Sequence, residues 1–296
     1  MKRLEVNKKI ILLVTTLLLL FLIPQSLAQY NYEYANTTAR VNVTNSMPEI
    51  QSVLIDQDIT LNAGGIKPIQ CNASIQDWNG WDDIALVNAT LYHTTSTHES
   101  PDDGNTHHTN TSCENTGNDG VYIAQYTCTF YLIHYANNGT WTCQVHTQDT
   151  YGFTDSMMNT TTINELYAIN VTDMIDYGDL AVTDTSPEIP ATLTNFGNMA
   201  IGVSVLGYGA VEGDGYGLMC ALGGNIGVEH QRFSEETSLW IGKTPLASTN
   251  QDMSLTIPQA TDLTAPTTWT TFWQLYVPPN PQGECTGTIR FTATPA

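Results

Sequence analysis

Apolar and polar residues alternate in four short stretches between Met47 and about Asn164. An alternation with a period of two is typical of strands that bury one face. The residues expected to face inward are Ile69, Cys71, Ala73 and Ile75 in the first stretch, Ala85, Val87, Ala89 and Leu91 in the second, Tyr126, Cys128, Phe130 and Leu132 in the third, and Trp141, Cys143 and Val145 in the fourth. These stretches predict a β-sandwich domain over residues 47–165.

A second group of strand-like stretches lies between residue 166 and Ala296. Residues 189–198 and 200–205 have the pattern of a strand, an Asn/Gly turn and a strand, and residues 273–279 and 283–293 are expected to form a closing pair of strands. The abundance of Thr, Asn, Gly and Tyr, with few Lys, Glu or Leu, favours strands and turns over helices. We therefore predict an all-β protein with a second β-sandwich over residues 166–296.

The first 28 residues have the three parts of a secretory signal peptide. Basic residues at positions 2, 3, 8 and 9 precede an apolar run over 10–23, and the small residues Ser26 and Ala28 provide a cleavage site before Gln29. The run is short for a bilayer crossing, so cleavage is favoured over a retained anchor, and we expect no stable membrane span. The protein is then exported and works outside the cell or at its surface.

Residues 29–46 form a Tyr- and Thr-rich arm that has no core of its own. Its one alternating stretch, residues 39–44, places Val41 and Val43 on the same face. We interpret this arm as a linker or as a strand that pairs with a sheet outside its own segment.

Acidic residues dominate the exported chain. Without residues 1–28 it carries 5 basic and 28 acidic side chains, a formal charge of −23. Such a surface repels nucleic acid and anionic lipid, which are bound through clustered Lys and Arg, so we expect neither as a partner. The six cysteines are even in number, and an oxidising compartment predicts three disulfides, although the count alone leaves 15 pairings open.

Eight Asn-x-Ser/Thr sequons occur up to residue 170, and none follows in the remaining 126 residues. The acceptor residues are Asn36, Asn42, Asn72, Asn88, Asn110, Asn138, Asn159 and Asn170. In the alternation described above, Asn72 and Asn88 point away from the core. If the first half is glycosylated, the second half, which lacks sequons, is expected to face a partner, a subunit or the wall. The alternative is that the sequons arise by chance in a Thr-rich sequence.

The run Asn137-Asn-Gly-Thr-Trp-Thr-Cys143 resembles the D-x-G-x-Y-x-C corner that opens strand F of immunoglobulin-like domains. Asn137 stands in the Asp place. Trp141 stands in the Tyr place and removes the phenol that makes the corner hydrogen bond. The resemblance covers residues 47–164 and implies a disulfide between Cys71 and Cys143 across two sheets. It also implies a second disulfide, which staples a loop to the neighbouring strand and joins Cys113 to Cys128.

The second half looks like the C-terminal module of archaeal secreted surface proteins. The resemblance rests on the early turn Thr194-Asn-Phe-Gly-Asn198 and on the last strand, Gly283-Glu-Cys-Thr-Gly-Thr-Ile-Arg-Phe291. A weaker likeness connects this half with β-sandwich subunits of extracellular matrix fibres. An immunoglobulin-like or jelly-roll-like sandwich is implied, in which Cys220 pairs with Cys285.

The loop Asp77-Trp-Asn-Gly-Trp-Asp-Asp83 offers carboxylate and amide oxygens at close spacing. Such oxygens are the ligands of hard cations such as Ca²⁺. The candidate ligands are Asp77, Asn79, Asp82 and Asp83. A structural turn is the favoured interpretation, because Asn-Gly is a turn signal by itself, and a calcium site is the alternative. We expect no other cofactor.

Other residues that could bind a metal, a phosphate or a sugar have a simpler structural interpretation. His107 and His108 fit an exposed loop better than a metal signature, and the glycines between 207 and 217 fit a loop or bulge better than a phosphate loop. Tryptophans can form a sugar-binding platform, although in a β-sandwich they more often pack inside; the candidates are Trp78, Trp81, Trp240, Trp269 and Trp273. We find no motif that pairs a nucleophile with a base and predict no enzyme activity.

The sequence as a whole predicts a secreted structural glycoprotein, a subunit of an extracellular filament or surface layer. Copies of the chain are the expected partners, joined when residues 29–44 add as an edge strand to the next subunit and bury Val41 and Val43. A monomeric cell-surface adhesin or carbohydrate-binding module, with glycans as partners, is the alternative. An accessory domain pair of a secreted hydrolase is a third hypothesis.

Overall fold

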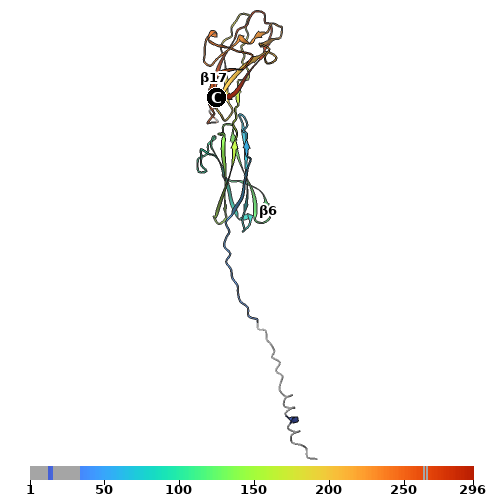
Figure 1. Cartoon of the computed structure of the whole chain (residues 1–296), viewed down its shortest axis with the longest axis vertical. Coiled ribbons are helices and arrows are strands. Elements are labelled where there is room, and N and C mark those ends of the chain that lie inside the picture. The colour runs from blue at the N-terminus through green and yellow to red at the C-terminus, as the bar shows by residue number, and fades with distance from the viewer. Residues whose placement is uncertain (1–12, 16–33, 263, 265) are drawn as a thin grey trace, which may run out of the picture. The chain divides into compact units, whose positions relative to one another are not determined.

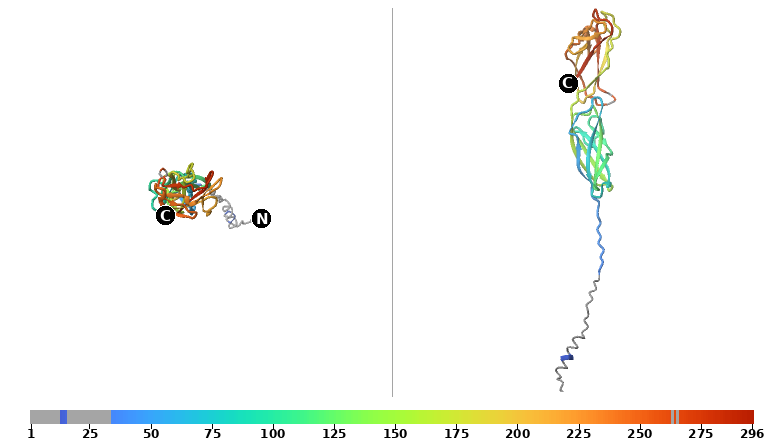
Figure 2. Two further views of the ribbon diagram at one scale, coloured as in Figure 1. Left: turned by 90° about the horizontal axis from the view of Figure 1, so that it is seen from above. Right: turned by 90° about the vertical axis from the view of Figure 1, so that its right-hand side faces the viewer.

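A computed structural model describes residues 13–15, 34–262, 264 and 266–296 (Figures 1 and 2). Strands dominate the described residues, which confirms the all-β prediction. Most of the predicted signal peptide and the first residues of the arm lie outside the described residues. Within the part of the chain that is described, no helix has the length and apolarity that a membrane crossing requires.

The chain divides into two compact units, residues 1–44 and residues 45–296. In the first unit, Tyr34–Thr44 form neither helix nor strand, and their side chains are exposed. In the second unit there are two hydrophobic cores. One is built from buried residues between 50 and 163, and the other from buried residues between 177 and 277.

The first core lies between two sheets, with the strand orders β1-β3-β7-β6 and β2-β9-β8-β4-β5. The strands are β1 (Glu49–Ile55), β2 (Asp58–Ile59), β3 (Ile66–Gln76), β4 (Ile84–His93), β5 (His107–Asn110), β6 (Glu114–Asp119), β7 (Ile123–Ile133), β8 (Gly139–Asp149) and β9 (Thr154–Ile163). The first order matches strands A, B, E and D of an immunoglobulin-type sandwich, and the second contains G, F, C and C′. This half is therefore a β-sandwich with immunoglobulin-type strand order.

Alternate residues of these strands fill the first core, and disulfides connect it. The disulfide between Cys71 of β3 and Cys143 of β8 joins the two sheets, with the Cα atoms 6.6 Å apart. A second disulfide joins Cys113, just before β6, to Cys128 of β7. These are the pairs that the immunoglobulin resemblance implied. By loop-closure entropy, each stabilises the fold by about 3–4 kcal/mol.

Ala85 was predicted to face inward, and this prediction is wrong. Its side chain is exposed, whereas Ile84 is buried. The register between β4 and β8 shifts between Ile84 and Leu86, and such a β-bulge inverts the alternation at the start of the strand. From Val87 onward, the predicted alternation is correct.

Trp141 makes a corner hydrogen bond that the replacement of tyrosine was expected to remove. Its indole Nε1–H donates to the backbone oxygen of Asn137 over 2.8 Å, and its side chain is fully buried. A tyrosine corner likewise connects strand F with the backbone a few residues upstream. The indole therefore replaces the phenol, and the expectation of a missing bond is wrong.

The second core lies among three sheets, with the strand orders β10-β11-β18-β15-β16, β17-β12-β20 and β14-β13-β19. The strands are β10 (Ile169–Val171), β11 (Ile189–Asn195), β12 (Ile201–Tyr208), β13 (Tyr216–Cys220), β14 (Ile226–Gly227), β15 (Gln231–Ser234), β16 (Thr244–Pro245), β17 (Gln251–Ile257), β18 (Thr268–Leu275), β19 (Cys285–Thr286) and β20 (Thr288–Pro295). Cys220 and Cys285 are neighbours on β13 and β19, and a disulfide joins them.

The Asn/Gly turn after β11 connects two sheets rather than two paired strands. β11 pairs with β10 and β18, whereas β12 pairs with β17 and β20. Asn195 is fully buried, and its Nδ2 donates to three backbone oxygens, among them that of Met199. A Cβ on Gly197 would lie 1.9 Å from the backbone oxygen of Leu166. The turn is therefore a packed corner. The predicted closing strands, β18 and β20, also lie in different sheets.

The glycine-rich segment between β12 and β13 is a loop organised around Asp214. Its carboxylate accepts hydrogen bonds from the backbone N–H groups of Gly209, Ala210, Val211 and Tyr216. Desolvation of the carboxylate opposes its ionisation, but the N–H donors outweigh this effect and lower the pKa of Asp214 to about 2.

Replacing Trp141 with Phe is expected to lower the free energy of unfolding by about 2–4 kcal/mol, because it opens a cavity and leaves the carbonyl of Asn137 unpaired. Urea unfolding followed by circular dichroism measures this change. The matched control is Trp269→Phe, at a partly exposed side chain, which should cost less than about 0.5 kcal/mol. Equal costs for the two variants would contradict the structural role of the corner.

Asp214 is expected to make the stability of the second sandwich depend on pH under acid conditions. The pKa of its carboxylate is lower in the folded chain than its ordinary value of 3.8. Its contribution is therefore complete above about pH 4 and declines as the pH falls towards 2. Thermal unfolding should show a difference between the wild type and Asp214→Asn that shrinks over this range. A difference independent of pH, or one equally large for the exposed control Asp119→Asn, would refute this assignment.

Candidate metal centre and open groove

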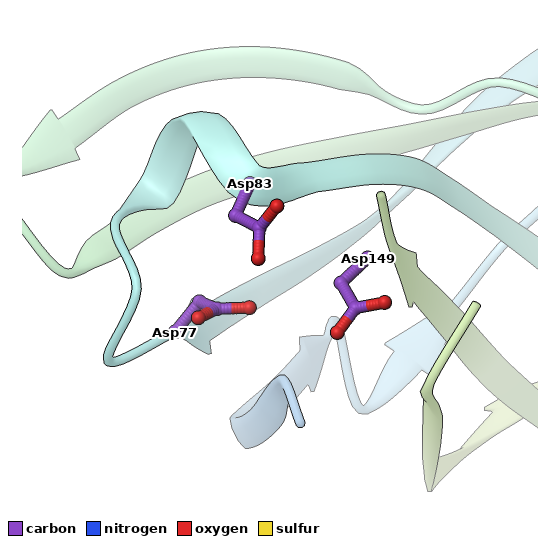
Figure 3. Close-up of side chains that lie close together, drawn as sticks. All are labelled: Asp77, Asp83 and Asp149. Atoms are coloured by element: carbon purple, nitrogen blue, oxygen red, sulfur yellow. The ribbon is translucent and has the colours of Figure 1, made fainter. Parts of the chain in front are cut away.

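Three aspartates from different segments meet beside the ends of β3 and β8. Asp77 directly follows β3, Asp83 ends the 3₁₀ turn Trp81–Asp83, and Asp149 ends β8. Oxygens from the three carboxylates lie within 4.8 Å of one another. Figure 3 shows the three carboxylates turned toward a shared space. Asp77 and Asp149 are buried, and Asp83 is half-buried. We call these three residues the acidic cluster.

Local turns hold the carboxylates in place. Oδ1 of Asp77 accepts the backbone N–H of Asn79 over 2.8 Å. Oδ1 of Asp149 accepts the backbone N–H groups two and four residues further on, at 2.9 and 2.8 Å, within the turn between β8 and β9. The hydroxyl of Thr150 donates to Asp83. Each carboxylate thus has one oxygen fixed by its own turn or a neighbouring turn.

Other oxygens beside this space have no hydrogen-bond partner among the described residues. They are Oδ2 of Asp77, Oδ2 of Asp83 and Oδ1 of Asn45, and all three are buried. Asn45 belongs to the same site, because its Nδ2 donates to Oδ2 of Asp149 over 2.6 Å. Since a buried acceptor without a partner costs free energy, this arrangement favours a bound positive ligand.

The charges of the acidic cluster also favour a positive ligand or a proton. Burial raises the pKa of Asp77, the N–H of Asn79 lowers it, and the charges of Asp83 and Asp149 raise it, so that the net shift is upward. Among the described residues, none of the three carboxylates forms an ion pair with Lys, Arg or His. An all-oxygen donor set of this kind is chemically suited to Ca²⁺.

The structure brings together only part of the predicted calcium ligands. Asp77 and Asp83 belong to the acidic cluster. Asp82 is exposed, and Oδ1 of Asn79 accepts the backbone N–H of Ser46 over 2.7 Å. The candidate site therefore lies on one side of the predicted loop, and its other donors come from distant parts of the sequence.

Asp149 was not predicted as a ligand from the sequence, although its spacing from a cysteine matches that of Asp77. It lies six residues after Cys143, just as Asp77 lies six residues after Cys71. An even spacing keeps a residue on the same face of a strand, and the disulfide holds the two strands together. Asn45 carried no such signal, because it lies outside every alternating stretch.

The two adjacent histidines lie on strand β5, so their predicted placement in an exposed loop is wrong. His107 is buried, with Nδ1 2.9 Å from Oδ1 of Asp102. The ring of His108 lies 6.0 Å from that of Trp141, and burial lowers the pKa of His108. His107 is thus held by a polar partner, and His108 packs against an aromatic ring.

Exposed aromatic side chains lie on the chain segments next to the acidic cluster. Trp78 is 62% exposed and lies 5.4 Å from the ring of Tyr122. The other members come from the same turns, and we call the set the aromatic rim: Trp78, Trp81, Tyr122, Tyr151 and Phe153. Of the remaining candidate tryptophans, Trp273 is buried, Trp269 is partly exposed, and Trp240 stacks under Arg232.

The predicted glycosylation sites all lie on residues with some solvent access. Asn36, Asn42, Asn72 and Asn170 are exposed, and the other four are half-buried. The half-buried acceptors are Asn88, Asn110, Asn138 and Asn159. Two of these four use Nδ2 in a hydrogen bond, Asn110 to the backbone of Thr129 and Asn159 to the backbone of Val53. The exposed residues are therefore the most accessible acceptors.

A groove of 1190 Å³ opens in the second sandwich between residues 171–182 and residues 281–291. Apolar side chains in its lining are Leu218, Ile226, Leu275, Val277, Ile289 and Phe291. Acidic side chains in its lining are Asp173, Asp176, Asp179 and Glu284. Two sheet edges border it. Among the described strands, β10 pairs only with β11 and β20 only with β12, so each leaves one edge unpaired.

Comparison with known proteins gives only distant structural likeness. No protein-family model matches the chain, and no curated protein matches it. The structure of a chaperone–tip adhesion subunit pre-assembly complex from the archaic chaperone-usher Csu pili of Acinetobacter baumannii is similar, with 11% identity and a TM-score of 0.41. The match covers 82% of this chain and 99% of that one.

Two further solved structures are similar at the same remote level. The C-terminal domain of the AgI/II polypeptide BspA from Streptococcus agalactiae has 9% identity and a TM-score of 0.22, over 84% of this chain and 96% of that one. A DUF4785 family protein from Legionella pneumophila has 9% identity and a TM-score of 0.26, over 85% of this chain and 48% of that one. Likeness at these scores carries no argument about function.

Proposed function

We propose that this protein is a non-catalytic structural subunit of an extracellular filament or surface layer, in which residues 34–44 of one copy add as a strand to the next copy. Its three disulfides indicate an oxidising, extracellular compartment. The observation that carries the proposal is the exposure of Val41 and Val43. Each is 81% exposed, and neither belongs to a strand of the described structure.

The groove in the second sandwich is the acceptor that best fits this strand. In an extended backbone, Val41 and Val43 share one face and can cover apolar residues of the groove such as Val277 and Phe291. The free edge of β20 supplies backbone N–H and C=O groups for pairing, as in other cases of strand addition. Burial of the two valines contributes about 1.5–3 kcal/mol each.

Charge favours the same pairing. Arg40 is the single charged residue of segment 34–44, and its charge is positive. The groove carries four acidic side chains in its lining, among them Asp176 and Glu284. Opposite charges steer association and fix the register of a contact.

The exposed segment 34–44 joins the first sandwich at the end that lies away from the second sandwich. The arm enters the first sandwich at Asn45, beside Asp149 and thus near the end of β3. The start of β3 lies toward the second sandwich, because the nearby Gly64 donates its N–H to the backbone oxygen of Phe196 over 3.0 Å. The 11 residues of β3 span about 36 Å. A head-to-tail contact, in which the arm of one copy enters the groove of another, can repeat from copy to copy.

The double variant Val41→Asp/Val43→Asp is expected to abolish polymerisation of the mature chain, because two carboxylates would have to enter an apolar, acidic groove. Negative-stain electron microscopy and size-exclusion chromatography measure the outcome. The matched control is Asn42→Asp/Thr44→Asp, which adds the same charge on the opposite face and should retain most of the fibres. Both variants and the wild type should be made without glycosylation. A wild type that stays monomeric, or fibres formed by the valine variant, would refute the proposal.

The aromatic rim supports a second candidate function, a monomeric adhesin or carbohydrate-binding module. Exposed aromatic faces such as those of Trp78 and Tyr122 can stack on sugar rings.

Under this second hypothesis, Trp78→Ala is expected to weaken binding to a glycan panel at least about tenfold, the equivalent of 1.4 kcal/mol. Trp269→Ala, outside the aromatic rim, serves as the control and should bind as the wild type does. The absence of any glycan binding by the wild type would exclude this candidate.

A further inference from the structure

The acidic cluster has no role in strand addition, and its geometry requires a separate explanation. Three carboxylates converge within 4.8 Å, and two of these residues are almost fully buried, Asp77 at 0% and Asp149 at 2% exposure. Oδ2 of Asp77 is buried and lacks a partner among the described residues, and Figure 3 shows the carboxylate of Asp77 turned toward the other two. Carboxylates that stabilise a fold are normally paired or hydrogen-bonded when they are buried. This group is arranged for a ligand.

We propose that Asp77, Asp83 and Asp149, together with the amide oxygen of Asn45, bind one Ca²⁺ ion that fixes the root of the N-terminal arm to the first sandwich. Asn45 supplies the third buried oxygen without a partner, after Oδ2 of Asp77 and Oδ2 of Asp83, and its Nδ2 donates to Asp149. These donors come from three separate places in the sequence, namely Asn45, the loop that contains Asp77 and Asp83, and Asp149, so the ion joins three segments of one domain.

The donor set selects Ca²⁺ by its chemistry. All four side chains offer oxygen, and none offers the sulfur or imidazole nitrogen that Zn²⁺ and copper prefer. Ca²⁺ accepts irregular geometry and six to eight oxygens, whereas Mg²⁺ requires a near-ideal octahedron. Water and nearby backbone carbonyls can complete the coordination of Ca²⁺. We expect a dissociation constant of about 10⁻⁴–10⁻³ M, as in extracellular calcium modules.

The position of Asn45 gives the ion a structural consequence. Residue 45 is the first of the compact unit 45–296, and the exposed segment Tyr34–Thr44 directly precedes it. The next residue, Ser46, donates its N–H to Asn79 in the turn that follows Asp77. An ion held by Asn45 and Asp77 therefore orders the last two residues of the arm, Asn45 and Ser46. The ion site itself lies wholly in residues 45–296 and does not depend on the proposed function. Only the role of the ion in strand addition rests on that proposed function.

Terbium luminescence tests the site directly, because Tb³⁺ replaces Ca²⁺ and is excited through nearby tryptophan, here Trp78 and Trp81. The EDTA-treated mature chain is expected to bind one Tb³⁺, which Ca²⁺ displaces, and to unfold at a higher temperature in millimolar Ca²⁺. The Asp77→Asn and Asp149→Asn variants should lose the luminescence and the thermal shift. The matched control, Asp82→Asn, changes an exposed acid of the same loop and should retain both.

Two measurements separate a metal site from a merely structural cluster. Without Ca²⁺, Asp77→Asn should be at least as stable as the wild type, because it removes a repelling charge, yet it should gain nothing from Ca²⁺. Hydrogen exchange at residues 45–48 should slow when Ca²⁺ is added to the wild type, and Asn45→Ala should reduce this protection and weaken Ca²⁺ binding.

A chain that begins at Asn45 should still bind Ca²⁺ even if polymerisation is lost, so failure of the strand-addition proposal would leave this result intact. The inference is overturned if the wild type shows neither Tb³⁺ luminescence nor a thermal shift at 10 mM Ca²⁺, an amount about tenfold above the weakest affinity expected. It is also overturned if Asp82→Asn abolishes both signals as completely as Asp77→Asn.

Discussion

The disulfide between Cys71 and Cys143 is the constraint on which the arrangement of the first sandwich depends. It joins the central strands β3 and β8 of the two facing sheets, and both cysteines are fully buried. Six residues beyond each cysteine, on the same face of each strand, stand Asp77 and Asp149. The bond that closes the core thus also sets the distance between two carboxylates at the end of the domain. Trp141 anchors the start of β8, the opposite end of the strand from Asp149, through its indole N–H.

Much of the fold follows from period-two alternation, and the exceptions have identifiable causes. The buried faces of β3, β7 and β8 follow directly from their sequences, and the cysteines on those faces pair as the immunoglobulin resemblance implied. Ala85 was misplaced because a β-bulge leaves no mark in the local pattern. The pairing of β11 and β12 was not predictable from the turn between them, because Asn195 binds backbone groups that are distant in sequence.

The candidate sites were less predictable than the fold, because they combine distant segments. Asp77 and Asp83 lie in one acidic loop, and their sequence indicated oxygen ligands. Asp149 could be found only by knowing that β3 and β8 face each other in two sheets and that each aspartate lies six residues after its cysteine of the disulfide. The groove lies between β10 and β20, the edge strands of two sheets. The alternation of apolar and polar residues does not show which strands lie at the edges of sheets.

The proposed functions place two unlike contacts on the two sandwiches. The first sandwich holds the root of the arm and the acidic cluster, and the second offers an apolar groove between two free sheet edges. A rigid root would reduce the conformational entropy that the arm loses when it binds, which favours assembly. Ca²⁺ at the root and strand addition at the groove would then act in the same direction, although each depends on different residues.

The most direct test of the central claim is hydrogen exchange of β20 in a chain that lacks residues 29–44, measured with and without a synthetic peptide of residues 34–44. Strand addition predicts that the peptide slows exchange of the amides on the free edge of β20 and leaves β6, at the edge of the first sandwich, unchanged. The same peptide with Val41→Asp and Val43→Asp should have no effect. Exchange at β20 that is unaffected by saturating wild-type peptide would contradict the account.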